Sequence, residues 1–407
     1  MDLRYLYGSE EQARKQERRF EALKDVFARH FGSTENITLI SAPGRTEIAG
    51  NHTDHNNGCV LAASVDMDSV AMVRPNGSSM INLYSDLYDK PFKVDIALLD
   101  PVPSERGTTY SLIRGMAAGF KERGYEVGGF DACVTSSVQR GSGLSSSAAF
   151  EVLLGKIISV LFNGDRLSAV ENAKISQWAE NSYFMKPCGL MDQMASAVGG
   201  LVYIDFARGG AQVESIKYDF AARGFTPCVV SAGGDHGNLT DEYASIPAEM
   251  KAVAKLLGGK TLRDVEDRIA SSIPELKGKV SDRAILRALH FVDENERVRK
   301  MVVSLKNDDL NAFFKYMILS GESSWKLLQN LYVAGSSNQE MPLALEMSRR
   351  FLSGRGAWRI HGGGFAGTIL AFVPSDEMAD YTRYMEAVFG QGSVKPLFIR
   401  PEGAVRL

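Results

Sequence analysis

The sequence predicts an α+β protein built from two domains. At 407 residues the chain is longer than the ~250–300 residues that one hydrophobic core usually serves. Its hydrophobic fraction of 44% and charged fraction of 23% are typical of globular proteins. Segments with the period of strands and segments with the period of helices both occur, but they do not alternate regularly as they do in parallel α/β folds.

The first half of the chain contains both kinds of segment. Ser9 and Gln12 have the spacing of a helix capping box, so we expect a helix over 9–31, whose apolar side chains fall on one face. Residues 129–138 alternate apolar and polar side chains, which is typical of a strand. The other expected strands are 36–40, 58–74, 80–84 and 199–206, and the other expected helices are 146–161 and 168–184.

A second domain is expected to begin near residues 207–212. We therefore divide the chain into an N-terminal domain of residues 1–210 and a C-terminal domain of residues 211–407. The second domain has expected strands at 213–218, 226–231, 367–373 and 394–399, and expected helices at 240–256, 283–304, 308–330, 338–353 and 376–389.

The composition excludes several classes of function. A formal net charge of −3 leaves no basic surface for nucleic acid. No apolar run reaches the ~18 residues of a membrane span, and Met1 leads into a charged helix rather than a secretion signal. The four cysteines are widely separated and form no Cys-x-x-Cys pair, which is typical of reduced thiols in a cytoplasmic protein.

A glycine- and serine-rich stretch just before a predicted helix is the most distinctive feature: Gly141, Gly143, Ser145, Ser146 and Ser147. Amides at the start of a helix favour anions, and glycines let phosphate oxygens approach the backbone. The serines add donors, or a neutral oxygen for Mg²⁺. The stretch is not the usual P-loop, because no lysine follows the serines. A serine-rich cap on an ordinary helix is the alternative interpretation.

A second polar segment, residues 41–58, lies between two apolar runs. Arg45 offers a planar fork for a phosphate or a carboxylate. Asn51, His52 and Asp54 supply mixed donors and acceptors that suit the hydroxyls of a sugar. The two histidines of this segment and the aspartate between them could instead hold a metal, although no third histidine or cysteine lies nearby. A turn in which the side chains cap their own backbone is a further alternative.

Asp192 follows the apolar pair Leu190-Met191 and precedes small residues, so its carboxylate is expected in apolar surroundings. A buried carboxylate needs a cationic or donor partner, which makes Asp192 a candidate base. An aspartate that caps a helix would give the same local pattern.

The fourth segment is a glycine cluster. Gly362, Gly364 and Gly367 formally satisfy the Gly-x-Gly-x-x-Gly pattern. That pattern needs a helix after the glycines to bind a dinucleotide, whereas the following residues are expected to form a strand. We therefore interpret the cluster as a glycine turn that approaches another loop or a phosphate.

In order and spacing, these segments resemble the signature motifs of the GHMP kinase superfamily and, within it, those of the galactokinases. The resemblance extends to the end of the chain, and the matching stretches are Ala42–Gly58, Gly143–Ala149, Ala179–Gln193, Gly362–Gly367 and Gly403–Leu407. It implies an N-terminal domain of the ribosomal-protein-S5 type, a ferredoxin-like C-terminal domain and an active site between them. The implied reaction is the ATP-dependent phosphorylation of galactose to galactose 1-phosphate.

The resemblance also implies a role for individual residues. Asp192 would be the base toward the anomeric hydroxyl, with Arg45 as its cationic partner, and Ser147 and Glu180 would hold Mg²⁺. The implied ATP-binding residues are Gly141, Ser142, Gly143, Leu144, Ser145, Ser146 and Ser147, with Tyr110–Gly115 beside the adenine. The implied sugar-binding residues are Asn51, His52, Asp54, Gly189 and Tyr243. We expect a monomer that binds a small sugar and MgATP, with neither nucleic acid nor membrane as a partner.

The chain departs from the family pattern at Asn51, where galactokinases usually carry a glutamate that accepts from the C6 hydroxyl, and at His55, where they usually carry a tyrosine. An asparagine accepts without charge, so this departure concerns the identity of the sugar and not the reaction. One alternative is a 1-kinase for a C6-altered relative such as galacturonate or a pentose. Another is a sugar sensor without catalysis, against which the intact serine stretch and Asp192 argue.

Overall fold

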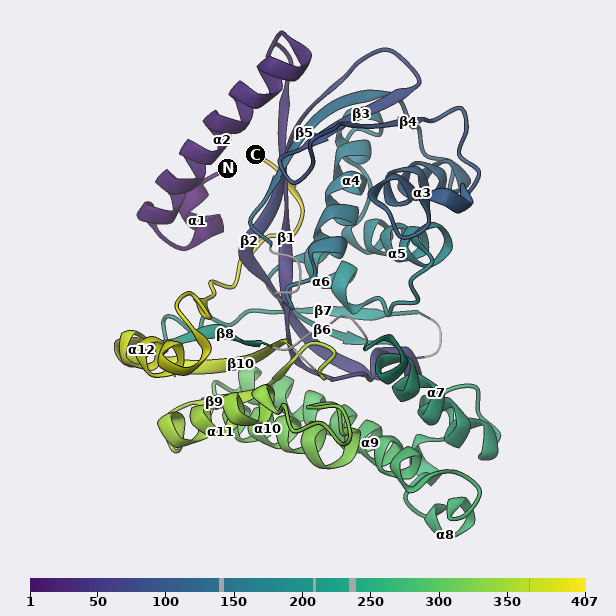
Figure 1. Ribbon diagram of the computed structural model, residues 1–407, viewed down its shortest axis with the longest axis vertical. Helices are drawn as coiled ribbons and strands as arrows, with labels where there is room; N and C mark the ends of the chain where they lie inside the picture. Colours follow the sequence, from purple (N-terminus) through teal and green to yellow (C-terminus); the bar gives the residue numbers. More distant parts are fainter. Residues whose placement is uncertain (139–142, 208–209, 234–238, 366) are drawn as a thin grey trace.

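The computed structural model describes residues 1–138, 143–207, 210–233, 239–365 and 367–407. Two β-sheets dominate it, and the long strands of the first run down toward the second, which crosses below them (Figure 1). Both chain ends lie beside the first sheet. None of the helices in the described part of the chain is long and apolar enough to cross a membrane.

The first sheet has eight strands. The strands are β1 (Thr38–Ala49), β2 (Cys59–Pro75), β3 (Met80–Ser85), β4 (Phe92–Asp95), β5 (Phe130–Ser136), β6 (Leu201–Asp205), β7 (Gln212–Ile216) and β12 (Val405–Arg406). Their order is β12-β1-β2-β5-β3-β4, while β6 pairs with β2 and β7 pairs with β6. Only β3 and β5 run parallel among these described pairs.

Helices cover both faces of the first sheet (Figure 1). On one face lie α1 (Leu3–Tyr7) and α2 (Glu10–Phe31), and on the other α3 (Thr109–Glu122), α4 (Ser146–Phe162), α5 (Ala169–Ala179) and α6 (Met191–Val198). The expected start of the first long helix is confirmed, because Ser9 Oγ accepts the Gln12 N–H at 3.2 Å.

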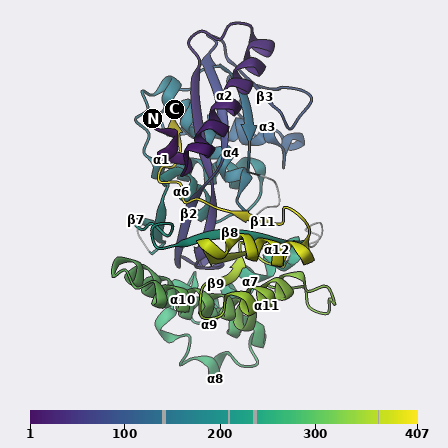
Figure 2. The same cartoon turned by 90° about the vertical axis from the view of Figure 1, so that its left-hand side faces the viewer.

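The second sheet has four strands and carries helices below it (Figures 1 and 2). Its order β11-β8-β10-β9 is formed by β8 (Phe225–Gly233), β9 (Ala357–His361), β10 (Gly367–Pro374) and β11 (Val394–Pro396). The helices are α7 (Thr240–Leu256), α8 (Ile273–Leu276), α9 (Asp282–Lys306), α10 (Leu310–Ser323), α11 (Glu340–Leu352) and α12 (Met378–Phe389).

Short helical turns complete the described secondary structure. Two are π-turns that continue α5 and α10, at Glu180–Phe184 and Ser324–Leu328. The 3₁₀ turns are Asp54–Asn56, Pro103–Glu105, Leu262–Asp264, Glu266–Arg268 and Ser375–Glu377.

The expected α+β class is confirmed, but several details differ from the sequence-based expectation, including the following. The strand expected at 36–40 continues to Ala49, so half of the segment interpreted as a polar loop is a buried strand. Strand β9 was not expected. The chain remains in the first sheet through β7, beyond the expected boundary at residue 210, and β12 returns to pair with β1.

Candidate active site

A cavity of about 280 Å³ lies where β1, the starts of α4 and α6, and the glycine turn after β9 meet. Its lining comes from both sheets and their helices: Arg45, Gly143, Ser145, Ser146, Ser147, Lys186, Asp192, Tyr243, His361, Gly362, Gly363, Gly364, Gly367 and Thr368. A larger groove of about 890 Å³ runs between the α1–α2 turn and residues 396–402, and none of the predicted site residues lines it.

Arg45 and Asp192 form the central pair of this cavity. Arg45 Nε is 2.6 Å from Asp192 Oδ1, and Arg45 Nη2 is 2.8 Å from Oδ2, so the contact is bidentate. Ser145 Oγ also donates to Oδ2. Burial alone would raise the pKa of Asp192, but the Arg45 guanidinium and the Ser145 hydroxyl hold it below its ordinary value. Asp192 is therefore an ionised carboxylate at neutral pH.

The serine-rich stretch ends in two left-handed residues and then starts α4. Gly143 has φ +74°, and a Cβ there would lie 2.5 Å from Thr368 Oγ1, so the close approach requires glycine. Ser145 has φ +56°, which aims its hydroxyl at Asp192. The carbonyl of Leu144 accepts the Arg45 N–H at 3.1 Å. Residues 141 and 142, also expected to bind ATP, lie outside the described residues.

The start of α4 therefore faces the cavity. Ser146 and Ser147 open this helix, and both line the cavity. The first amides of a helix have no partner within the helix, which makes this end attractive to an anion.

Ser147 and Glu180 meet beside the cavity, as a shared cation would require. Ser147 Oγ is 3.4 Å from Glu180 Oε1, and the Glu180 side chain is only 3% exposed. Gln193 Nε2 donates to Glu180 Oε2 at 2.8 Å and to Glu151 Oε2 at 3.1 Å. One hydroxyl and one carboxylate fit Mg²⁺, which is bound by few protein ligands and by substrate phosphates.

The predicted sugar residues converge in part. Asp54 packs on Gly189, where a Cβ would lie 1.6 Å from Asp54 Oδ2, so only glycine fits. His52 Nε2 is 2.8 Å from the carbonyl of Gly363, which requires a proton on that nitrogen. Burial lowers the pKa of His52 to about 3, so the ring is neutral. In the described part of the chain no three metal-binding side chains come together, so the metal alternative for this segment gains no support.

Tyr243 contributes from α7. Its hydroxyl donates to the carbonyl of Gly364 at 2.7 Å, and its ring meets Phe365 edge-on. A Cβ at Gly363 would lie 2.6 Å from the Tyr243 ring, so the glycine turn can pack here only without side chains. Tyr243 and the glycine turn thus form one wall of the cavity.

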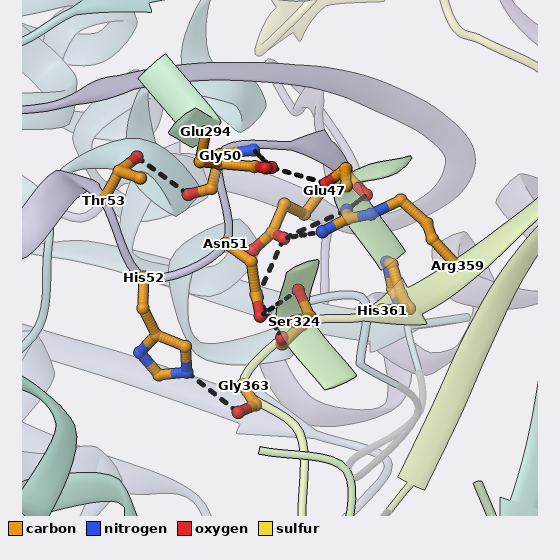
Figure 3. A network of polar contacts seen from close by, with 12 residues as sticks. Glu47, Gly50, Asn51, His52, Thr53, Glu294, Ser324, Arg359, His361 and Gly363 are labelled. Carbon is orange, nitrogen blue, oxygen red and sulfur yellow. Dashed lines mark hydrogen bonds and ion pairs between the residues drawn. The ribbon is translucent and has the colours of Figure 1, made fainter. Parts of the chain in front are cut away.

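Asn51 is not placed as the sequence suggested. Its side chain is fully buried and lies outside the cavity lining (Figure 3). Nδ2 donates to Glu47 Oε1 at 3.0 Å and to the carbonyl of Gly362 at 2.7 Å, while Oδ1 accepts from Asn330 at 2.8 Å. Because both ends of the amide are occupied by protein, the expected direct contact between Asn51 and the sugar is corrected to a link between the sugar segment and the glycine turn.

Several residues of this link were missed by the sequence analysis. Arg359, on β9, donates to Glu47 Oε1 from two nitrogens at 3.1 Å, and both side chains are buried (Figure 3). His361 Nε2 lies 3.0 Å from Thr46 Oγ1. Arg359 and His361 sit just before the glycine cluster on alternate positions of a strand, which was the available signal for their shared direction.

Helix α9 supports the sugar segment from the other side. Glu294 Oε1 accepts the Gly50 N–H at 2.9 Å, and His290 Nε2 donates to the carbonyl of Asn51 at 3.0 Å. Asn295 Oδ1 accepts the Cys59 N–H at 2.8 Å. These three residues follow a helical spacing, but nothing in the local sequence distinguishes them from an ordinary buried helix face.

Comparison with known proteins identifies the class of fold. Residues 111–200 match the N-terminal domain of GHMP kinases. The structure resembles that of Lactococcus lactis galactokinase complexed with galactose, with a TM-score of 0.83 and 22% identity over 95% of this chain and 100% of that one. It also resembles Methanococcus jannaschii mevalonate kinase, with a TM-score of 0.64 and 15% identity over 90% and 99% of the two chains. These matches indicate the fold of the GHMP kinases.

Closer matches in sequence narrow the class. Residues 25–75 match the galactokinase galactose-binding signature. A galactokinase from Glaesserella parasuis is 32% identical over 363 residues, covering 88% of this chain and 90% of that protein. One from Clostridium acetobutylicum is 28% identical over 378 residues, covering 91% and 92%. The chain belongs to the galactokinase family.

Proposed function

We propose that this protein transfers the terminal phosphoryl group of ATP to the anomeric hydroxyl of galactose. The observation that carries the proposal is the bidentate Arg45–Asp192 pair, which stands beside the start of α4 in one cavity. A carboxylate beside an anion-binding helix end brings a hydroxyl acceptor next to a phosphate site. Membership of the galactokinase family supports the choice of galactose.

Asp192 orients the attacking hydroxyl and receives its proton. Because Arg45 and Ser145 keep the pKa of Asp192 low despite burial, the carboxylate is a poor base toward a free sugar hydroxyl. Phosphoryl transfer passes through a loose transition state, in which that hydroxyl becomes acidic only as its bond to phosphorus forms. Asp192 therefore accepts the proton late, and Arg45 holds its two oxygens in a fixed direction.

Mg²⁺ is proposed at Ser147 and Glu180, where it would neutralise charge on the nucleotide phosphates. Gln193 holds the second oxygen of Glu180, which leaves Oε1 toward Ser147. His52, Asp54, Gly189 and Tyr243 are proposed to surround the sugar, and Asn51 is proposed to act on it only through the buried link.

We also propose that the enzyme acts as a monomer. A cytoplasmic location is proposed because the reaction consumes ATP and because the four cysteines are free thiols.

A sugar panel with MgATP tests the proposal. Galactose, galacturonate, arabinose and glucose are each incubated with ATP and Mg²⁺, and ADP release and the phosphorylated product are measured. We expect galactose 1-phosphate as the main product and loss of turnover when Mg²⁺ is chelated. A preference of about tenfold or more for galacturonate or the pentose, which is about 1.4 kcal/mol, would favour the 1-kinase for a C6-altered sugar. Binding of galactose without turnover of any sugar would favour the sensor.

A further inference from the structure

Lys186 lines the cavity and has no role in the function proposed above. Its Nζ is 3.2 Å from Glu180 Oε1. The Lys186 side chain is 60% exposed, whereas the Glu180 side chain is 3% exposed. Ser147 and Asp192 line the same cavity. The ammonium group therefore sits at the mouth of the site, between solvent and an enclosed carboxylate.

The backbone fixes the position of this lysine. The π-turn after α5 ends at Met185, whose φ of +65° is unusual for a residue with a side chain. The N–H groups of Met185 and Lys186 both donate to the carbonyl of Glu180, the second at 3.2 Å. Two residues later, the Cys188 N–H donates to Asn181 Oδ1 at 2.8 Å. Lys186 is therefore attached to a turn that hydrogen bonds hold on both sides.

Lys186 also has donors to spare, unlike the other cation of the cavity. Arg45 uses Nε and Nη2 on Asp192 and Nη1 on the carbonyl of Gly143. His361 adds no charge, because burial holds its pKa well below the ordinary value. Within the part of the chain that the structure describes, Lys186 Nζ contacts one polar partner, Glu180, and an ammonium has three donors.

The terminal phosphate of a bound nucleotide must lie in the space that Lys186 lines. The attacking hydroxyl belongs beside Asp192 and the other phosphates belong at the start of α4, so the group in transfer lies between them. In P-loop proteins a lysine of the loop itself reaches the terminal phosphates. The serine-rich stretch here has no lysine after its serines.

We propose that Lys186 binds the terminal phosphate, donating from Nζ to a non-bridging oxygen, and so supplies from the turn after α5 the cation that the serine-rich stretch lacks. The inference rests on the proposed function in one respect, that the nucleotide binds at the start of α4. A divalent cation on Glu180 would repel the ammonium, and the exposed side chain can then turn toward the phosphate. The opposing interpretation is that Lys186 only neutralises Glu180.

The test compares binding of an ATP analogue that cannot transfer its phosphate with binding of ADP, both in Mg²⁺ and without sugar, by calorimetry. The variants are Lys186→Met, Lys186→Arg and, as a matched control, Lys174→Met, which removes an exposed lysine from α5. Loss of a hydrogen bond from a charged donor weakens binding by about 10- to 100-fold. We expect that loss for the analogue in Lys186→Met and a change under about threefold for ADP. Lys186→Arg should keep most of the affinity, and Lys174→Met all of it.

If Lys186→Met changed the affinities for the analogue and for ADP equally, or changed neither, the inference would be overturned. The two ligands differ only in the terminal phosphate, so a contact with that phosphate must affect the analogue alone. A lowered thermal midpoint in Lys186→Met with unchanged preference for the analogue over ADP would assign Lys186 to neutralisation of Glu180. The result does not depend on which sugar is phosphorylated. A failed sugar panel with a selective loss of analogue binding would therefore reject the proposed function and retain the role of Lys186.

Discussion

Asp192 keeps its charge in a half-buried position because Arg45 contacts both of its oxygens. The change Asp192→Asn preserves the size of the side chain but leaves an amide that cannot accept the proton of the sugar. We expect kcat to fall by about 10²- to 10⁴-fold, the usual contribution of an acid–base group, while galactose and nucleotide still bind. Steady-state kinetics and calorimetry measure the two effects. Asp25→Asn on the exposed face of α2 is the control, and retention of more than about a third of the turnover would contradict the role of Asp192.

The contacts of some side chains could be predicted from the sequence, and those of others could not. The residues alone predicted that the Asp192 carboxylate needs a cationic or donor partner, and the resemblance to the galactokinases implied that Arg45 is that partner. The inward direction of Asn51 could not be predicted. Its partners, Gly362 and Asn330, come from segments about three quarters of the chain away, and only the packing of the two sheets brings them together.

Helix α9 supports the sugar segment through Glu294, which accepts from the Gly50 N–H and from Arg297 Nε. The change Glu294→Ala leaves a buried N–H and a buried guanidinium without this partner, at a cost of about 1–3 kcal/mol for each neutral group and more for the charged one. We expect the KM for galactose to rise at least about fivefold, the effect of about 1 kcal/mol, and the KM for ATP to change little. The thermal midpoint should fall as well.

Two further variants distinguish whether Glu294 positions the sugar segment or only stabilises the fold. Glu294→Gln keeps an oxygen for the Gly50 N–H and should recover most of the galactose KM. Asp293→Asn removes the neighbouring carboxylate, which is 55% exposed, and should change neither constant. If Glu294→Ala raised the two KM values equally, α9 would stabilise the fold without positioning the sugar segment.

At the scale of elements, helices with a polar face and a capping residue could be predicted, as for α2 with Ser9. The second half of β1 could not, since its polar residues resemble a loop. They are tolerated in a buried strand because each finds a partner: Arg45 meets Asp192, Thr46 meets His361 and Glu47 meets Arg359. Register shifts against β2 near Pro43 and Ala49 further separate this strand from a regular alternating pattern.

Neutral histidines contribute to the contacts that join the two parts of the molecule. His52 contacts Gly363, His361 contacts Thr46, and His290 contacts Ser323 and the carbonyl of Asn51. Burial lowers the pKa of His290, and the nearby Glu294 only partly opposes this. The contacts to Gly363, Thr46 and Asn51 join residues more than 200 positions apart, so the sequence could indicate the two parts of the molecule but not how they are held together.

The pH dependence of stability tests the junction between the sheets. The pKa of His290 is lowered in the folded protein from its ordinary value of 6.5, so below that pH the unfolded chain binds a proton that the folded protein does not. The contribution of His290 to the free energy of unfolding is therefore present above pH 6.5 and is lost as the pH falls. A single proton bound by the unfolded chain alone can account for no more than about 1.4 kcal/mol between about pH 7.5 and about pH 5.5.

His290→Gln isolates this contribution from other buried groups that shift the opposite way, such as Asp66, whose pKa burial raises to about 6. The glutamine can still donate to the carbonyl of Asn51 but does not titrate. We expect the variant to be less stable than the wild type near pH 7.5, and the difference in the free energy of unfolding to shrink near pH 5.5. Urea unfolding at the two pH values measures this difference in the free energy of unfolding. His30→Gln, on the exposed end of α2, is the control. A difference that stays constant with pH would mean that the pKa of His290 is the same in the folded and unfolded chains, and a difference that grows as the pH falls would mean that the folded protein binds the proton.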